Sequence, residues 1–288
     1  MVVRLGIVGM LPGLLELEAS HLEAVASLNL TGFSLGAQRD VLFDVTSAEL
    51  SRVKSVIGSS GMDLVQFGIN YKECLFDPDE SVRRHVTETI HRGIEVGVEL
   101  GAHVSLIRPG SLNPSGSYNP SPDNHRPECR ERILETLRSV AAKAETEGTT
   151  VVAETHMLTL MDSPETNAEL LGAVGSDRLK VVMDFVNHLQ TLSQVFDSTP
   201  RLNHIFDVMG PISGVGHYKD AVVGDGLVLH INEALPGEGE LDLQTVLKRW
   251  EAFYPDGYML LEHLPNEKYP TAAANAHQHI RDAGVSLH

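Results

Sequence analysis

The chain has 288 residues, of which 42% are hydrophobic and 21% charged, and its formal net charge is −17. This composition is typical of a folded globular protein and excludes a disordered or low-complexity chain. The excess of 39 acidic over 22 basic side chains argues against nucleic acid as a partner, because no basic cluster reverses the resulting field.

The chain has two cysteines, Cys74 and Cys129, and no long apolar segment. Two cysteines are too few for a disulfide framework or a zinc knuckle, so we expect free thiols in a reducing compartment. No stretch reaches the roughly 18 apolar residues of a membrane span, and the N-terminal apolar run lacks the features of a signal peptide. We therefore expect a cytoplasmic protein that makes no membrane contact.

Strand-like and helix-like segments alternate along the chain, a pattern typical of parallel strands joined by helical crossovers. About eight such units predict a (β/α)8 TIM barrel, an α/β fold, as one domain over residues 1–288. We expect Ser47 to cap the first clear helix, which glycine then ends. The predicted strands are residues 4–9, 29–35, 62–69, 103–110, 149–155, 179–185, 213–219 and 257–263, and the predicted helices are residues 47–61, 78–102, 127–148, 163–176, 241–253 and 271–284.

Two irregular stretches, residues 108–124 and 230–242, follow the fourth and seventh predicted strands. In a parallel barrel both would overhang the C-terminal face, where active-site loops lie. Arg108 would stand at this face, where it could clamp a carboxylate or phosphate. His103, at the start of the same strand, is expected on the opposite, structural face.

The last four predicted strands each end in a charged or imidazole side chain. The runs are VVAE, KVVMD, GVGH and YMLLE, which end at Glu154, Asp184, His217 and Glu262. Parallel strand ends converge at one mouth of a barrel, so we expect these four donors to meet there. Three carboxylates and one imidazole suit a hard divalent ion, Mn²⁺ first, with Mg²⁺, Co²⁺ or Zn²⁺ as alternatives. The sequence thus predicts one metal ion held by Glu154, Asp184, His217 and Glu262.

The same segments resemble the xylose-isomerase-like barrel superfamily of sugar isomerases and epimerases. VVAETH, with Glu154 and His156, is similar to strand five of that family, and VVMDFVN, with Asp184 and Asn187, is similar to strand six. GHYKD is similar to its HxKD segment, and YMLLEH to its strand eight. The loop LPGEGELD also resembles a PGxGxxD loop that follows strand seven.

This resemblance implies roles for further residues. Glu154 and Glu262 would be acid and base as well as metal ligands. Lys219 and Asp220, from the HxKD segment, would lie close to substrate, and homo-oligomerisation is expected. The substrate-binding residues we expect are Arg108, His156, Asn187, His188, Lys219 and Asp220.

The chain also departs from its relatives. Ketose 3-epimerases of the family carry histidine at the position of Asn187, whereas here His188 is displaced by one residue. They also carry an arginine shortly after the strand-seven histidine, and residues 220–226, DAVVGDG, contain none. Endonuclease IV, a DNA-repair member, needs further histidine ligands, where this chain has Gln66 and Asn70. These differences predict a single metal ion and a substrate with different polar groups.

The function expected first is a metal-dependent isomerase or epimerase acting on a small sugar or keto-sugar through a metal-stabilised enediolate. The same intermediate could expel a substituent or lose CO₂. A metal-dependent lyase on an oxidised sugar or sugar acid, such as a dehydratase, decarboxylase or deglycosylating enzyme, is therefore the main alternative. A non-catalytic sugar-binding subunit is a third possibility, which the intact set of four donors disfavours.

Overall fold

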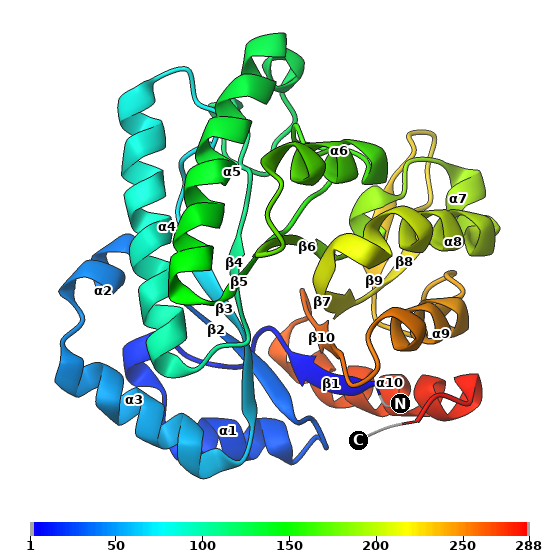
Figure 1. Ribbon diagram of the computed structural model, residues 1–288. Helices are drawn as coiled ribbons and strands as arrows, with labels where there is room; N and C mark the ends of the chain where they lie inside the picture. Colours follow the sequence, from blue (N-terminus) through cyan, green and yellow to red (C-terminus); the bar gives the residue numbers. More distant parts are fainter. Residues whose placement is uncertain (1–2, 287–288) are drawn as a thin grey trace.

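The computed structural model describes residues 3–286, which form a closed parallel barrel wrapped by helices (Figure 1). Neighbouring strands follow the order β1-β10-β7-β6-β5-β4-β3-β2, and every pair in the barrel is parallel. This arrangement confirms the predicted (β/α)8 TIM barrel. The barrel strands are β1 (Arg4–Ile7), β2 (Gly32–Gln38), β3 (Asp63–Asn70), β4 (Val104–Ile107), β5 (Thr150–Ala153), β6 (Leu179–Met183), β7 (Ser213–Tyr218) and β10 (Tyr258–Leu261).

Helices connect successive strands and cover the outside of the barrel (Figure 1). Each predicted strand overlaps one barrel strand, and each predicted helix overlaps one observed helix. The shorter helices α1, α2 and α7, together with α8, were not predicted. The helices are α1 (Ala19–Ala26), α2 (Arg39–Asp44), α3 (Ser47–Ser60), α4 (Glu80–Leu100), α5 (Pro127–Glu147), α6 (Pro164–Val174), α7 (Leu192–Phe196), α8 (Ser198–Met209), α9 (Leu243–Phe253) and α10 (Tyr269–Ala283).

The start of α3 corrects the predicted cap. Thr46, not Ser47, is the N-cap residue, and its hydroxyl accepts a hydrogen bond from the backbone N–H of Glu49. The Glu49 carboxylate accepts the Thr46 backbone N–H in return at 2.8 Å. This reciprocal pair satisfies two otherwise unpaired donors, which is why the cap lies one residue earlier than expected. Gly61, with φ of 70°, ends the helix in the left-handed conformation.

Two hydrophobic layers hold the barrel together. The larger lies between the strands and the surrounding helices, and a smaller inner cluster fills the barrel itself. Apolar side chains thus pack both faces of the strands, as expected for a parallel sheet. The inner cluster consists of Val65, Val104, Leu106, Val152, Val182, Val215, Tyr258 and Leu260.

The N-terminal end of the barrel carries a charged and aromatic group. Arg4 Nη1 lies 2.9 Å from Asp63 Oδ2, and the Tyr258 hydroxyl donates to the same oxygen at 2.9 Å. The Arg4 guanidinium also lies over the Tyr258 ring, 4.5 Å from its centre. His103 approaches Asp63 at 3.9 Å, which confirms that this histidine lies at the structural end of the barrel.

A β-hairpin that was not predicted rises from the opposite, C-terminal end. Strands β8 (Asp220–Val223) and β9 (Ile231–Ala234) pair antiparallel directly after β7. The region expected to be an irregular loop therefore contains part of a regular hairpin. Among residues 3–286, no helix is long and apolar enough to span a membrane.

Candidate metal centre

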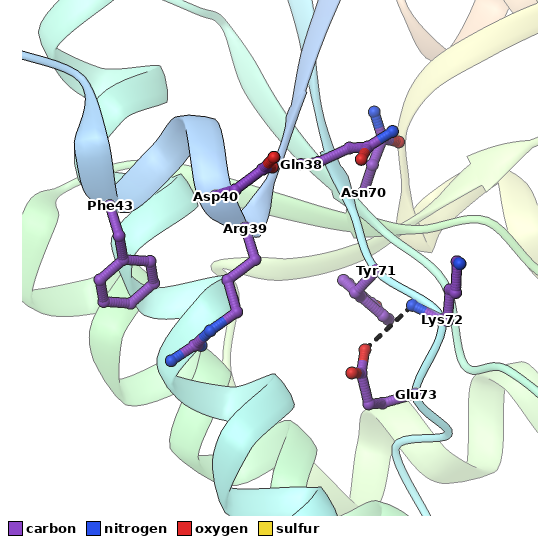
Figure 2. A pocket seen from close by; sticks show the side chains of 8 residues that line it. All are labelled: Gln38, Arg39, Asp40, Phe43, Asn70, Tyr71, Lys72 and Glu73. Carbon is purple, nitrogen blue, oxygen red and sulfur yellow. Dashed lines mark hydrogen bonds between the residues drawn. The ribbon is translucent and has the colours of Figure 1, made fainter.

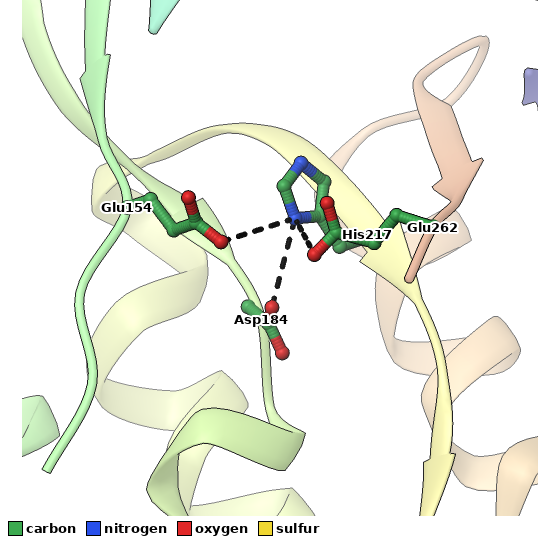
Figure 3. Close-up of side chains that lie close together, drawn as sticks. All are labelled: Glu154, Asp184, His217 and Glu262. Atoms are coloured by element: carbon green, nitrogen blue, oxygen red, sulfur yellow. Dashed lines mark ion pairs between the residues drawn. The ribbon is translucent and has the colours of Figure 1, made fainter. Parts of the chain in front are cut away.

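The four predicted donors meet at the C-terminal mouth of the barrel (Figure 3). Glu154 follows β5 directly, Asp184 follows β6, His217 lies in β7 and Glu262 follows β10. One ligand atom from each lies within 4.8 Å of the other three. Two ligands on opposite sides of an ion lie at most about 4–5 Å apart, because each bond is roughly 2.0–2.6 Å long. The spacing therefore fits a shared ion.

His217 Nδ1 is the centre of the group (Figure 3). It lies 3.0 Å from Glu262 Oε1, 3.6 Å from Asp184 Oδ2 and 4.0 Å from Glu154 Oε1. All four side chains are buried, with Asp184 fully so. The site thus combines three carboxylates and one imidazole in a space that excludes most water.

Three of these atoms lack a hydrogen-bond partner. They are Asp184 Oδ2, His217 Nδ1 and Glu262 Oε1, each buried from solvent. Buried polar atoms are normally hydrogen-bonded, whereas here the two carboxylate oxygens have only ion pairs with Lys219, so three such atoms around one point need an explanation. The donor set and these atoms fit a divalent cation, and the four residues can hold one.

Lys219 supplies the local positive charge. Its Nζ lies 2.6 Å from Glu262 Oε1, 2.7 Å from Asp184 Oδ2 and 3.1 Å from Glu233 Oε1. The side chain is only 2% exposed. Because His217 and Lys219 are two residues apart on one extended segment, both side chains point to the same side. The ammonium therefore balances the carboxylates beside the proposed ion position.

Gln66 fixes the orientation of His217. His217 Nε2 lies 3.1 Å from Gln66 Oε1, and Gln66 Nε2 donates to Ser34 Oγ at 3.3 Å. Because the amide nitrogen is used on Ser34, the amide oxygen faces the imidazole and accepts its Nε2–H. Nδ1 is then directed at the three carboxylates, where it carries a proton without a metal and would give its lone pair to a bound ion.

The charged groups of the cluster stabilise one another's ionised forms. Burial opposes the charged forms of Asp184 and Glu262, but the cationic His217 and Lys219 outweigh it and lower the pKa of both carboxyl groups. Burial likewise opposes charge on His217, and the neighbouring carboxylates, Glu262 first, raise the pKa of its imidazole above the ordinary value. The carboxylates are thus ionised at neutral pH and able to bind a cation.

Arg108 lies beside Glu154, at the edge of the site. Its Nε donates to Glu154 Oε2 at 2.9 Å, and its Nη1 donates to Asn70 Oδ1 at 3.3 Å. The Tyr71 hydroxyl contacts both the backbone N–H and the carbonyl of Arg108, at 2.8 and 2.6 Å. The arginine is therefore held at the mouth with its backbone fixed.

A cleft of about 480 Å³ opens above Glu154. Two of the predicted substrate-binding residues, His156 and Asn187, line it, together with Tyr118, Glu233 and other residues. The His156 ring stacks on Tyr118 with centroids 5.9 Å apart, and burial lowers the pKa of its imidazole. His156 thus faces the same mouth as Glu154, as expected from the alternation of side chains along a strand.

The sequence profile of one family, described as Xylose isomerase-like TIM barrel, matches residues 22–283. The chain belongs to this family. A comparison with curated proteins by sequence finds no significant match.

Solved structures with the same fold resemble the chain over nearly its whole length. A D-tagatose 3-epimerase-like protein is 16% identical, with a TM-score of 0.75 and coverage of 98% of each chain. The 3-keto-D-glucoside 4-epimerase of E. coli is also 16% identical, with a TM-score of 0.70 and coverage of 96% of this chain and 99% of that one. A xylose isomerase-like TIM barrel protein from Mycobacterium smegmatis, in complex with magnesium, is 14% identical, with a TM-score of 0.72 and coverage of 98% and 96%. At these identities the likeness establishes the fold.

Two residues expected to bind substrate do not face the cleft. The His188 side chain is completely buried, with Nε2 3.1 Å from Thr155 Oγ1, because the tight turn Val186–His188 directs it away from the neighbouring Asn187. Asp220 is 1% exposed, and its carboxylate accepts backbone N–H groups of Ala221, Gly237, Gly239 and Leu241. In this structure the two side chains contact buried groups and loop backbone instead of the cleft.

The Asp220 contacts explain the two glycines of the loop LPGEGELD. Gly237 has φ of 90°, a conformation that favours glycine. A Cβ on Gly239 would lie 2.3 Å from Asp220 Oδ1, so only glycine lets the loop backbone approach the carboxylate. Asp242 then caps α9 by accepting the Thr245 N–H at 3.1 Å. The motif is therefore structural in this chain.

Sequence reasoning did not identify the partners of Lys219. Glu233, from the hairpin, bonds both Lys219 and His263 Nδ1, the latter at 2.8 Å. His263 follows Glu262 and has φ of 56°, so the chain turns sharply as it leaves the ligand. His263 directly follows Glu262, which is a sequence signal that it lies near the site. Nothing in the sequence predicted that Glu233 lies near β7.

A second hollow lies at the ends of β2 and β3 (Figure 2). Its lining includes Phe43, Asn70, Tyr71 and Lys72 but none of the four donors. It approaches the candidate metal centre through Asn70 and Tyr71, which both contact Arg108. The chemistry of the site therefore belongs to the cleft above Glu154.

Proposed function

We propose that this protein is a divalent-metal-dependent isomerase or epimerase of a small sugar or keto-sugar, acting through an enediolate of the substrate. One observation carries the proposal. Buried atoms of Asp184, His217 and Glu262 converge on one point at the barrel mouth without a hydrogen bond, beside Glu154 and the Lys219 ammonium. The sugar epimerases among its structural neighbours support the same reaction class.

Glu154, Asp184, His217 and Glu262 would hold the ion, with Mn²⁺ the first choice and Mg²⁺, Co²⁺ or Zn²⁺ as alternatives. When bound, such an ion supplies Lewis-acid polarisation of a substrate carbonyl, which makes the adjacent C–H bond more acidic. The chain's own task is to place that C–H bond beside a carboxylate and to return the proton at the correct carbon or face.

Glu154 and Glu262 are the proposed acid and base. They follow β5 and β10, with β6 and β7 between them in the barrel, so they flank the site from two sides. Glu262 is held ionised by His217 and Lys219, so its carboxylate is in the protonation state that a general base requires. Arg108 binds one oxygen of Glu154 and leaves the other directed toward the site.

The remaining polar groups of the mouth would bind the substrate. His156 and Asn187 line the cleft and offer hydrogen-bonding groups to sugar hydroxyls. Arg108 can contact an anionic or carbonyl oxygen without releasing Glu154, because a guanidinium has five N–H donors. Lys219 would help to stabilise negative charge that develops on the substrate.

A lyase acting on an oxidised sugar is the second candidate. Asn187 stands where ketose 3-epimerases carry histidine, and the segment after Lys219 lacks their arginine. These differences change the groups that contact the substrate without changing the four donors. The same substrate enediolate could then expel a β-substituent.

Proton NMR in D₂O distinguishes the two reactions. Mg²⁺-loaded protein is incubated with a panel of ketoses and 3-keto-glucosides. Loss of the signal from a proton next to the carbonyl, with all groups retained, supports isomerisation or epimerisation. Release of water, CO₂ or an aglycone supports the lyase, and neither change on any substrate contradicts both. Glu154→Gln should abolish the exchange.

A further inference from the structure

Six of the residues that line the cleft above Glu154 are apolar. Met157 and Leu158 come from the loop after β5, Val186 and Leu189 from the loop after β6, and Leu229 and Ile231 from the hairpin. We call these six residues the apolar wall. Leu158 is 36% exposed and Leu229 is 48% exposed, so their side chains meet solvent in the open cleft. Three separate loops thus bring hydrophobic side chains to a cleft that is also lined by the Glu154 carboxylate.

The apolar wall is held in a fixed position relative to the metal centre. Ile231 and Glu233 alternate along β9, so both point to the same side and both line the cleft. Glu233 is bonded to Lys219 at 3.1 Å and to His263 at 2.8 Å. The ion pair therefore anchors β9, and with it Ile231, to the residues that flank Glu262.

A free sugar does not match this wall. Each hydroxyl placed against it would lose water without gaining a partner, at a cost of about 1–3 kcal/mol. An apolar group bound there would instead be favoured by removal of its surface from water. The cleft volume of about 480 Å³ also lies in the range of pockets that bind drug-sized molecules.

We propose that the substrate is a sugar derivative with an apolar substituent, such as an alkyl or aryl glycoside oxidised in its sugar ring. The sugar lies at Glu154 and its neighbours, and the aglycone packs on the apolar wall. The inference rests on the proposed function, since it assumes that the sugar binds at the four donors. Its tests measure binding rather than turnover, so the two can fail separately.

The test compares two unreactive probes, phenyl β-D-glucopyranoside and methyl β-D-glucopyranoside, which differ only in the aglycone. Their dissociation constants are measured by ligand-observed NMR titration with Mg²⁺-loaded protein. We expect the phenyl glucoside to bind about tenfold more tightly. In a Leu158→Asn/Leu229→Asn double variant the preference should fall to about threefold or less, because two hydrophobic contacts become polar.

Leu227→Asn is the matched control. Leu227 is fully exposed on the same hairpin and does not line the cleft, so this variant should keep the wild-type preference. Equal binding of the two probes by the wild type, or an unchanged preference in the double variant, would overturn the inference. A double variant whose sedimentation changes while its phenyl preference does not would assign the wall to a contact between copies of the chain and also overturn it.

The outcome separates this inference from the proposed reaction. A phenyl preference in protein that exchanges no proton of any keto-sugar contradicts the proposed reaction and supports the apolar subsite. Proton exchange on small free ketoses, with no phenyl preference, supports the reaction and contradicts the subsite.

Discussion

The two ends of the barrel both carry charged side chains, but these side chains are buried to different extents. At the N-terminal end, the side chains of Arg4 and Asp63 are 26% and 39% exposed, and they contact each other and Tyr258. At the C-terminal end, Asp184 and Glu262 are almost completely buried and each has an oxygen without a hydrogen bond. The first arrangement stabilises the fold, whereas the second keeps buried charge available for a ligand.

Replacing a ligand at the C-terminal end should have the largest effect. We expect Glu262→Gln to lower kcat by about 10³-fold or more, because it removes both a metal ligand and a proposed acid or base. Steady-state rates on a substrate identified by proton exchange would measure this, with circular dichroism as the check on folding. Glu267→Gln removes the same charge from an exposed position nearby and should leave kcat unchanged. Equal rates for the two variants would contradict the role given to Glu262.

Removing the buried cation tests the charge balance of the same end. Lys219→Met should lower the free energy of unfolding of the metal-free protein by about 3 kcal/mol, because Asp184 and Glu262 lose their partner. Added Mg²⁺ should restore more stability to this variant than to the wild type. Urea denaturation in EDTA and in Mg²⁺ measures both effects, and Lys268→Met, at an exposed lysine, is the control. A loss below about 1 kcal/mol in EDTA would show that the ammonium is not needed there.

The orientation of His217 can be tested through Gln66. We expect Gln66→Met to weaken Mg²⁺ binding by about 10–100-fold, because the imidazole loses the acceptor that fixes its tautomer. Gln66→Glu keeps an acceptor oxygen and should retain most of the affinity. Calorimetric titration with Mg²⁺ measures the change, and kcat at saturating metal should vary much less than the affinity. Equal affinities for wild type and Gln66→Met would refute this positioning role.

A buried histidine makes stability near the site depend on pH. Burial lowers the pKa of His188 to about 4, below the ordinary 6.5. As pH falls, the histidine of the unfolded chain is therefore protonated at a higher pH than that of the folded protein. The folded state loses stability between these two pKa values. From about pH 7.5 to about pH 5 the wild type should lose about 2 kcal/mol more stability than His188→Gln. Denaturation curves at several pH values measure the difference, and parallel losses in the two proteins would contradict it.

Breaking the N-terminal group should have the smallest effect. Arg4→Met should lower the free energy of unfolding by about 1 kcal/mol or less, because the pair with Asp63 is partly exposed. Metal affinity and kcat should stay at wild-type values, since the inner apolar cluster separates the two ends. Thermal denaturation and steady-state rates check both statements. A large loss of activity would mean that the two ends are coupled.

The sequence was sufficient to predict the barrel and to identify the four donors. Three donors directly follow a short apolar strand and His217 is the second-last residue of its strand, and parallel strands carry all such ends to one mouth. Local pattern therefore predicted a long-range arrangement. Predicting this arrangement required only the positions of the strand ends and no knowledge of side-chain contacts.

Features set by side-chain geometry could not be predicted in this way. Gln66 lies inside an apolar strand, and its partner His217 is 151 positions away. Asn187 and His188 are adjacent, yet a tight turn sends one to the cleft and the other into the core. The hairpin was missed because only Lys219 separates β7 from β8, so the sequence shows no clear break between the two strands.

Metal analysis of the purified protein tests the central claim most directly. Wild-type protein and Asp184→Asn are loaded with Mn²⁺, dialysed against metal-free buffer and measured by plasma mass spectrometry. We predict about one ion per wild-type chain and almost none in the variant, because Asp184 contributes a buried ligand oxygen that accepts no hydrogen bond. No retained ion in the wild type, or the same amount in both proteins, would contradict a metal centre at these four residues.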